Sequence, residues 1–209
     1  MQNKVLVFDL DATLYYAGDK IEELCDAKVI RYFAGKLNIS LKQSEDLVKD
    51  VRSRYIYDIE ALEHDFPFSK FEFMEDICDV DVSILPPDTE LNELLKHLPQ
   101  PKYILTDSIR RHVSDTLKAI HVDENLFAGV FDAHDMNYTF KHNPESFEMF
   151  LQKYNLKACD CVLFEDSVNN LKIAKSLGFK TVLIRPEYPE EQKADYWFPD
   201  IKTAITKLF

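Results

Sequence analysis

The residues Val5-Leu6-Val7-Phe8-Asp9-Leu10-Asp11 decide the fold, because an apolar run ends abruptly in two acids separated by one residue. A short continuous apolar run is typical of a strand buried on both faces, as in a parallel sheet. The two carboxylates at its end repel each other unless a cation or a shared proton relieves the repulsion. Magnesium suits this position, because it commonly takes one or two protein carboxylates and leaves room for a phosphate. A solvated turn is the alternative interpretation of the same two acids.

Apolar runs and amphipathic stretches alternate along most of the chain. We predict strands at five short runs rich in β-branched or aromatic residues: 4–8, 103–105, 129–131, 161–164 and 181–184. Helical periodicity fills most intervals. Pro144 is expected in the first turn of one helix, and Gly178 in a left-handed C-cap after another. This alternation predicts a doubly wound, Rossmann-like α/β domain with a parallel sheet.

One interval, residues 16–87, shows helical periodicity and no convincing strand. It is far longer than an ordinary connection between a strand and a helix. We therefore expect an inserted helical cap subdomain at 16–87, mounted over the C-terminal edge of the sheet. Residues 1–15 and 88–209 would form the α/β core domain, with Pro86-Pro87 marking the return of the chain to it.

The composition disfavours several classes of protein. Of the 209 residues, 46% are hydrophobic and 30% are charged, which is the balance of a globular chain. The formal net charge of −12 disfavours a nucleic-acid polymer as partner, because an acidic surface and phosphates repel each other. We see no secretory signal, and no run approaches the roughly 20 apolar residues that cross a bilayer. The sequence thus predicts a cytoplasmic protein with no membrane partner, and it predicts no particular oligomeric state.

The four cysteines are too few and too scattered for a disulfide framework. Cys159 and Cys161 have no second pair that would complete a zinc site. They lie two positions apart at the predicted start of a strand, where alternation would put both on one face. We therefore expect both thiols to be buried.

Chemically useful side chains follow two further predicted strands. Thr106-Asp107-Ser108 stands between a strand and a helix, where a hydroxyl and backbone N–H groups can bind phosphate. Glu165-Asp166-Ser167 follows another strand in the same way and supplies a second pair of acids. Helix capping would explain either segment alone, and Lys141 alone would be taken for a surface charge. Together with the first acid pair, they place acid, hydroxyl, cation and acid at successive ends of strands or starts of helices.

In this order the residues resemble the four motifs of the haloacid dehalogenase (HAD) superfamily of phosphohydrolases. Phe8-Asp9-Leu10-Asp11-Ala12-Thr13 resembles the first motif, Asp-x-Asp-x-Thr. Thr106 matches the second motif, Lys141 the third and Glu165-Asp166 the fourth. The resemblance covers nearly the whole chain, including residues 194–198, which look like the closing strand of the family.

Within the superfamily, three stretches look most like the pyrimidine 5′-nucleotidase branch: Leu14-Tyr15, residues 105–113 and residues 164–171. Three positions depart from the usual pattern. Asn is usual where Ala12 and Asp107 stand, and Pro is usual where His142 stands. Because an acid repels phosphate, we expect the side chain of Asp107 to turn away and only its N–H to serve.

The resemblance implies a mechanism with an aspartyl-phosphate intermediate. Asp9 would be the nucleophile that attacks phosphorus, and Asp11 would protonate the leaving oxygen and then deprotonate water. An acid that works near neutral pH needs a raised pKa, and the charge of Asp9 is expected to raise the pKa of Asp11. The ligands of Mg²⁺ would be the Asp9 side chain, the Asp11 backbone carbonyl and the Asp166 side chain.

Other matched residues would surround the phosphate and the metal. Thr106, Lys141 and the N–H of Asp107 would bind the phosphoryl oxygens, where charge spreads in the transition state. Glu165 would stand behind the metal ligands, and Asn170 would orient a metal-bound water.

The cap would set specificity. Its aromatic cluster at Phe66–Phe73 could stack on a base, although an aromatic stripe at helical spacing is more often the core of such a subdomain. Arg52 and Arg54 in the cap, or Arg110 and Arg111 after the second motif, could hold a second anionic group of the substrate or could be solvated charges.

The predicted function is Mg²⁺-dependent hydrolysis of a small phosphorylated metabolite, with a nucleoside 5′-monophosphate as one candidate. A phosphomutase acting on sugar phosphates could use the same intermediate, and a catalytically silent HAD-like binding protein could retain the same residues. A dehalogenase is disfavoured, because its chemistry needs neither the metal nor an acid for an oxygen leaving group. A signalling receiver domain is disfavoured by the chain length and the inserted helices.

Overall fold

The computed structural model describes residues 4–18, 20–189 and 193–209. The chain divides into two compact units, one made of Met1–Ala17 and Ser83–Phe209 and the other of Gly18–Val82. The first unit contains the sheet, and the second is helical. The helical unit therefore interrupts the first unit between its first and second strands.

Six parallel strands form one sheet in the order β3-β2-β1-β4-β5-β6. They are β1 (Val5–Phe8), β2 (Lys102–Leu105), β3 (Gly129–Phe131), β4 (Cys161–Glu165), β5 (Lys180–Ile184) and β6 (Tyr196–Phe198). The five strands predicted from apolar runs are present, and so is the closing strand of the tail. The doubly wound, Rossmann-like α/β fold is thus confirmed.

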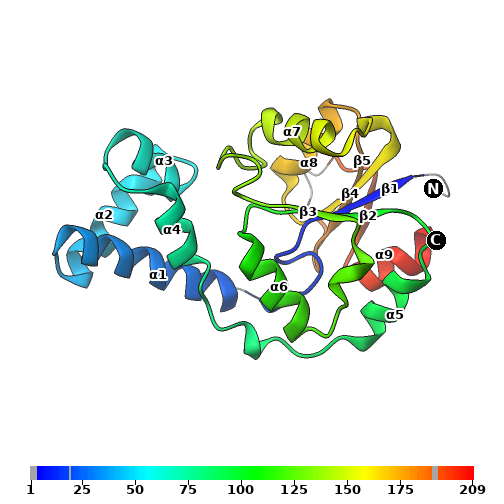
Figure 1. The fold of residues 1–209 in the computed structure, drawn as a ribbon, viewed down its shortest axis with the longest axis horizontal. Coiled ribbons are helices and arrows are strands. Elements are labelled where there is room, and N and C mark those ends of the chain that lie inside the picture. The colour runs from blue at the N-terminus through cyan, green and yellow to red at the C-terminus, as the bar shows by residue number, and fades with distance from the viewer. Residues whose placement is uncertain (1–3, 19, 190–192) are drawn as a thin grey trace. The chain divides into compact units, whose positions relative to one another are not determined.

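Helices cover both faces of this sheet (Figure 1). On one face lie α7 (Pro144–Tyr154) and α8 (Val168–Ser176), and on the other α5 (Thr89–His97), α6 (Arg110–Ala119) and α9 (Ile201–Leu208). Short 3₁₀ helices lie at η1 (Val82–Ile84), η2 (Glu124–Leu126) and η3 (Ala158–Asp160). The central strand β1 is consequently enclosed, and its side chains Leu6, Val7 and Phe8 are completely buried.

Helix ends follow local sequence signals. Asn143 caps α7 by accepting a hydrogen bond from the backbone N–H of Glu145, and Pro144 stands in the first turn. Gly178 follows α8 with a φ of +100°, a left-handed conformation that glycine adopts without strain. Both predicted helix ends are confirmed.

The helical unit contains α1 (Lys20–Leu37), α2 (Leu41–Arg54), α3 (Asp58–His64) and α4 (Lys70–Ile77). Its core is aromatic, because Phe33 and Phe73 are buried and the rings of Tyr32 and Phe73 meet edge to face at 5.0 Å. Phe66 and Phe68 stack on each other, and Phe66 also packs against Phe33. The aromatic stripe therefore serves mainly as the core of this unit.

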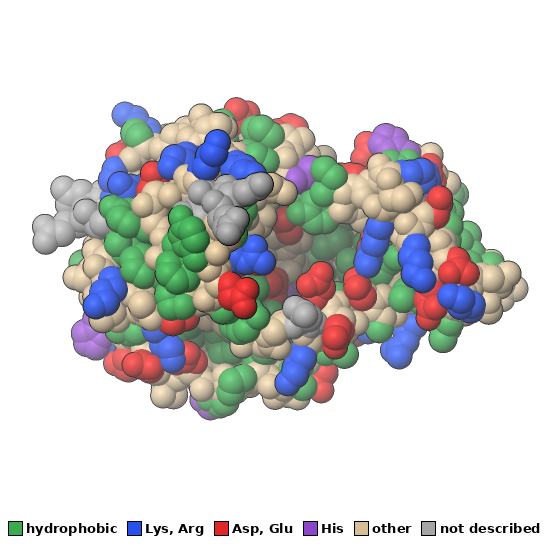
Figure 2. Space-filling view, turned by 180° about the vertical axis from the view of Figure 1, so that it is seen from behind, with side chains coloured by type: hydrophobic (Ala, Val, Ile, Leu, Met, Phe, Trp, Pro, Cys, Tyr) green, Lys and Arg blue, Asp and Glu red, His purple; other side chains and the backbone are tan. Residues whose placement is uncertain are grey.

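The surface of the helical unit is charged. Figure 2 shows basic and acidic side chains mixed over the face of this unit that it displays.

Among the described residues, no helix combines the length and the apolar composition that a membrane span requires.

Cys159 and Cys161 lie in different environments. Cys161 begins β4 and is completely buried, and burial raises the pKa of its thiol to about 12. Cys159 lies in η3 and is exposed, so the expectation that both thiols are buried is wrong for Cys159. The reason is that η3 ends only at Asp160, so strand alternation does not reach back to Cys159.

We predict that iodoacetamide at about pH 8 labels Cys159 and spares Cys161, because alkylation requires an accessible thiolate. Peptide mass spectrometry after brief exposure measures both sites in the same molecule. Unfolding in guanidinium should make the two sites react alike. Labelling of Cys161 as fast as Cys159 in the folded protein would contradict the burial described above.

Candidate active site

The ends of three neighbouring strands meet at one edge of the sheet. β1 pairs in parallel with β2 on one side and with β4 on the other. Asp9 extends this pairing, since its backbone N–H donates to the carbonyl of Phe164 over 2.9 Å. Thr106 directly follows β2, and Glu165-Asp166 stands at the end of β4. The parallel register therefore brings the predicted site residues Asp9, Thr106 and Glu165-Asp166 to one edge.

Three carboxylates gather at this edge. One oxygen from each of Asp9, Glu165 and Asp166 lies within 4.8 Å of the others. Burial, together with the charge of Glu165, raises the pKa of Asp9 well above its usual range and that of Asp166 to about 8. Three hard oxygen donors that are largely withdrawn from water fit a divalent cation such as Mg²⁺. We refer to these three residues as the acid cluster.

The ammonium group of Lys141 reaches into the acid cluster. Its Nζ donates to a carboxylate oxygen of Asp9 and, over 2.8 Å, to Oε2 of Glu165. Burial alone would lower the pKa of Lys141, but the charges of Asp9 and Glu165 raise it well above its usual range. Burial alone would likewise raise the pKa of Glu165, but Lys141 lowers it. Lys141 and Glu165 thus form an ion pair, and the raised pKa values of Asp9 and Asp166 indicate that these two carboxyl groups favour either a proton or a cation beside them.

The loop that leads to Lys141 has an unusual backbone. Asn137, Tyr138 and Phe140 have φ values of +50°, +61° and +53°, which non-glycine residues rarely adopt. The backbone N–H of Lys141 donates to Oδ1 of Asp107 over 2.9 Å. Asp107 thus connects the turn after β2 to this loop, because its carboxylate accepts a hydrogen bond from the loop backbone.

Thr106 lies in the turn that follows β2, and Asn170 lies in the first turn of α8. Oγ1 of Thr106 is buried and accepts from the backbone N–H of Ser108 over 3.1 Å. Asn170 lies in the first turn of α8, where its backbone N–H donates to the capping residue Ser167. Ser167 is therefore the N-cap of α8, as the capping interpretation of that segment predicts. Within the described residues no side chain caps the start of α6.

Asp11 faces hydrogen-bond donors. Oδ1 lies 2.8 Å from Nε2 of His112 and also accepts from the hydroxyl of Tyr15, while Oδ2 accepts from Oγ of Ser108 over 2.7 Å. Burial alone would raise the pKa of Asp11, but the charge of His112 and these hydrogen bonds lower it to about 2. The expectation of a raised pKa is therefore wrong, because the charge of His112 and the three hydrogen bonds outweigh the effect of burial.

His112 is the residue of this site that the sequence analysis missed. It is the third residue of α6, is 3% exposed and shares the buried side of the helix with Val113 and Thr116. The available signal was a histidine among buried positions directly after the second motif. A histidine at such a position gives no indication of its partner, and only the contact with Asp11 reveals one.

Three of the four arginines considered as anion ligands bind acids of their own unit. Within the helical unit, Arg52 pairs with two acids and Arg54 with two others: Asp26 and Asp58, and Asp50 and Asp65. Arg110 pairs with Glu124. The hypothesis that Arg52, Arg54 or Arg110 holds a second anionic group of the substrate is therefore not supported, since their charges are already matched.

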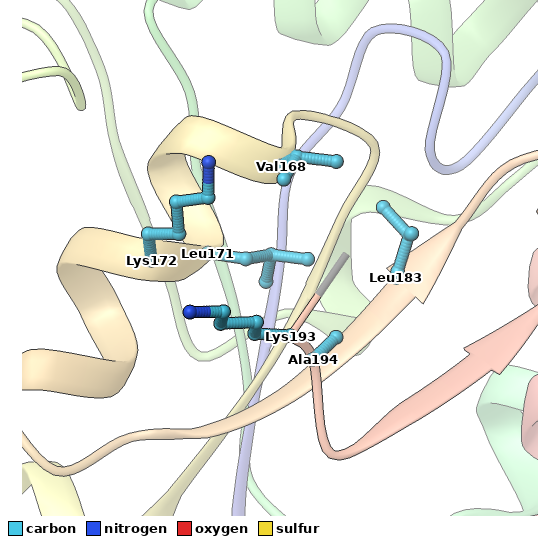
Figure 3. A pocket seen from close by; sticks show the side chains of 6 residues that line it. All are labelled: Val168, Leu171, Lys172, Leu183, Lys193 and Ala194. Atoms are coloured by element: carbon cyan, nitrogen blue, oxygen red, sulfur yellow. The ribbon is translucent and has the colours of Figure 1, made fainter. Parts of the chain in front are cut away.

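A small recess lies beside α8 and is too small for a substrate. Its volume of about 10 Å³ accommodates no more than a water molecule. Figure 3 shows apolar side chains turned toward one another on one side of the recess and two lysine side chains extending to the other. The lining residues are Val168, Leu171, Lys172, Leu183, Lys193 and Ala194.

Comparisons with known proteins identify the family. A family model described as a haloacid dehalogenase-like hydrolase matches residues 3–178, and the chain belongs to this family. Phosphate metabolism protein 8 of Saccharomyces cerevisiae is 24% identical over an alignment of 197 residues that covers 86% of this chain and 61% of that protein. This chain thus spans less than two thirds of the length of that relative.

Solved structures share the fold. A HAD phosphatase from Thermococcus onnurineus matches with a TM-score of 0.64 at 19% identity, covering 98% of this chain and 97% of that one. An L-2-haloacid dehalogenase from Xanthobacter autotrophicus matches with a TM-score of 0.63 at 14% identity, covering 97% of each chain. Because phosphatases and dehalogenases match equally well, the fold alone does not decide the reaction.

Ala12 lies in a left-handed conformation with a φ of +59°, at the position where Asn is usual in the family motif. This conformation costs most L-residues roughly 1–2 kcal/mol, and Asn tolerates it better. We predict that Ala12→Asn increases the free energy of unfolding by about 0.5–1 kcal/mol. Urea unfolding measures the change.

Ala128→Asn is the matched control, because Ala128 is exposed and has no positive φ. No gain in stability is expected there. An equal effect at both positions would show that the backbone conformation of Ala12 is not the cause.

Proposed function

We propose that this chain is a Mg²⁺-dependent phosphomonoester hydrolase that acts through an aspartyl-phosphate on Asp9. The observation that carries the proposal is the acid cluster around Lys141 at the ends of β1 and β4. A dehalogenase that displaces halide from carbon has no use for three clustered carboxylates. A phosphotransferase does, because a cation bound there would lie next to the transferred phosphoryl group.

The acid cluster fits Mg²⁺ by the chemistry of its donors, which are carboxylate oxygens. We assign the side chains of Asp9 and Asp166 and the backbone carbonyl of Asp11 as ligands. Bound Mg²⁺ would reduce the repulsion between the phosphate and these acids. Glu165, which is 1% exposed and accepts from Lys141, would orient the ammonium group beside the cation.

The remaining residues are assigned by their positions. Lys141 donates a hydrogen bond to a carboxylate oxygen of Asp9. It would therefore orient Asp9 as the nucleophile and also bind the phosphoryl group. Thr106 and the N–H of Asp107 would bind phosphoryl oxygens in the turn after β2, and Asn170 would orient a metal-bound water. Asp11, which its donors keep ionised, would accept a proton from the attacking water, and it would protonate the leaving oxygen once the negative charge of a bound phosphate raises its pKa.

We further infer that the helical unit acts as a cap that selects the substrate, and that this substrate is a small phosphorylated metabolite. The insertion of this unit between the first and second motifs supports that role. The motif stretches that look most like pyrimidine 5′-nucleotidases favour a nucleoside 5′-monophosphate as the first substrate to test.

Phosphate release from a panel of nucleoside 5′-monophosphates, sugar phosphates and aryl phosphates tests the proposal. We expect turnover with Mg²⁺, none with EDTA, and a loss of at least about 1000-fold in kcat for Asp9→Asn. Asp115→Asn, which changes an exposed acid on α6, should leave kcat unchanged.

The alternatives give different results in the same assay. A phosphomutase would move phosphate between positions of a sugar bisphosphate with little release. Absence of metal-dependent turnover on every ester would favour a silent binding protein and would overturn the proposed hydrolase.

A further inference from the structure

The carboxylate of Asp11 is held from two segments that are distant in sequence. Tyr15 contributes a hydroxyl from the loop after β1, and Ser108 and His112 contribute donors from the turn after β2 and from α6. Because an ionised carboxylate only accepts hydrogen bonds, Nε2 of His112 is the donor in its pair. Both oxygens of Asp11 are thus engaged, which fixes the plane of the carboxylate.

The start of α6 lacks a side-chain cap, and the hydroxyl just before it binds Asp11 instead. Its N-cap residue is Ile109, which offers no side-chain hydrogen bond to the first turn. A capping Ser, Thr, Asn or Asp would stabilise the helix by accepting a hydrogen bond from an unpaired backbone N–H of the first turn. Ser108, one residue before the cap, instead donates its hydroxyl to Asp11. Residues 108–109 therefore do not stabilise the first turn of α6 through a side-chain cap, and Ser108 orients Asp11 instead.

The burial of His112 points the same way. Its neighbours on the buried side of α6 include Val113 and Leu117, which are 0% and 1% exposed. An apolar side chain would pack there without the desolvation cost of an imidazole. The contact with Asp11 over 2.8 Å is a polar interaction that favours a histidine at this position.

The geometry points to His112 as a positioning residue that orients Asp11 as the base in hydrolysis of the aspartyl-phosphate. The inference rests on the proposed function. In that step the oxygen of water forms a bond to phosphorus, and the bond between phosphorus and the Asp9 oxygen breaks. The water proton passes to Asp11, and Asp9 regains its carboxylate. A carboxylate that is fixed in plane keeps one oxygen aimed at the attacking water. Such orientation of a general base increases the rate of hydrolysis substantially.

The test is the split between kcat and KM on p-nitrophenyl phosphate, whose leaving group needs little protonation. The ratio kcat/KM then reports formation of the aspartyl-phosphate, and kcat reports its hydrolysis. We expect His112→Leu to lower kcat by about 10-fold or more and KM in parallel, with kcat/KM changed by less than about 3-fold. Intact-protein mass spectrometry under turnover should show the phosphorylated protein accumulating.

Two further variants separate positioning from packing. His112→Gln can place an amide N–H near the position of Nε2, and we expect it to keep kcat within about 3-fold of the wild type. Thr116→Val is the matched control, since Thr116 is a buried polar residue one turn further along α6. It should change neither kcat nor the amount of phosphorylated protein.

If His112→Leu does not fold, Ser108→Ala removes a different donor to Asp11 and is expected to give the same split. Equal losses of kcat and kcat/KM without phosphorylated protein would overturn the inference and leave the proposed function standing. The same split in Thr116→Val would also overturn it. Absence of phosphate release by the wild type would instead overturn the proposed function, and this inference with it.

Discussion

The contacts of the Lys141 ammonium group with Asp9 and Glu165 are the constraint on which the rest of the site depends. The parallel register of β1 and β4 brings the two carboxylates together away from water, where their repulsion is strong. Withdrawing ions from water costs several kcal/mol each, so a buried charge cluster is weak evidence for stability. It is better evidence for chemistry, because such clusters concentrate at functional sites.

Two acids separated by one residue receive opposite environments in this fold. Asp9 faces Glu165 and Asp166, and its pKa is raised well above the usual range. Asp11 faces His112 and other donors, and its pKa falls to about 2. Environments that push the pKa values of neighbouring acids apart commonly distinguish their chemical roles. Here the nucleophile would lie beside the cation, and the base would lie beside His112, Ser108 and Tyr15.

The sequence predicts the sheet and the acid cluster because both depend on local signals. An apolar run followed by Asp9, or by Glu165-Asp166, specifies a buried strand and its polar end. Parallel pairing of the two strands then brings these polar ends together. The environment of Asp11 was not predictable in this way, since His112 lies 101 residues away in sequence. The two alternatives for Arg52 stayed open for a similar reason, because pairing of its charge within the helical unit is set by tertiary packing.

The central claim is that the acid cluster binds a divalent cation, and thermal unfolding with and without Mg²⁺ tests it most directly. A ligand that binds only the folded state raises the unfolding temperature. We expect Mg²⁺ to raise the unfolding temperature of the wild type. We expect Asp166→Asn to be at least as stable as the wild type in EDTA and to show no such rise. An unresponsive wild type, or an equal rise in both proteins, would contradict it.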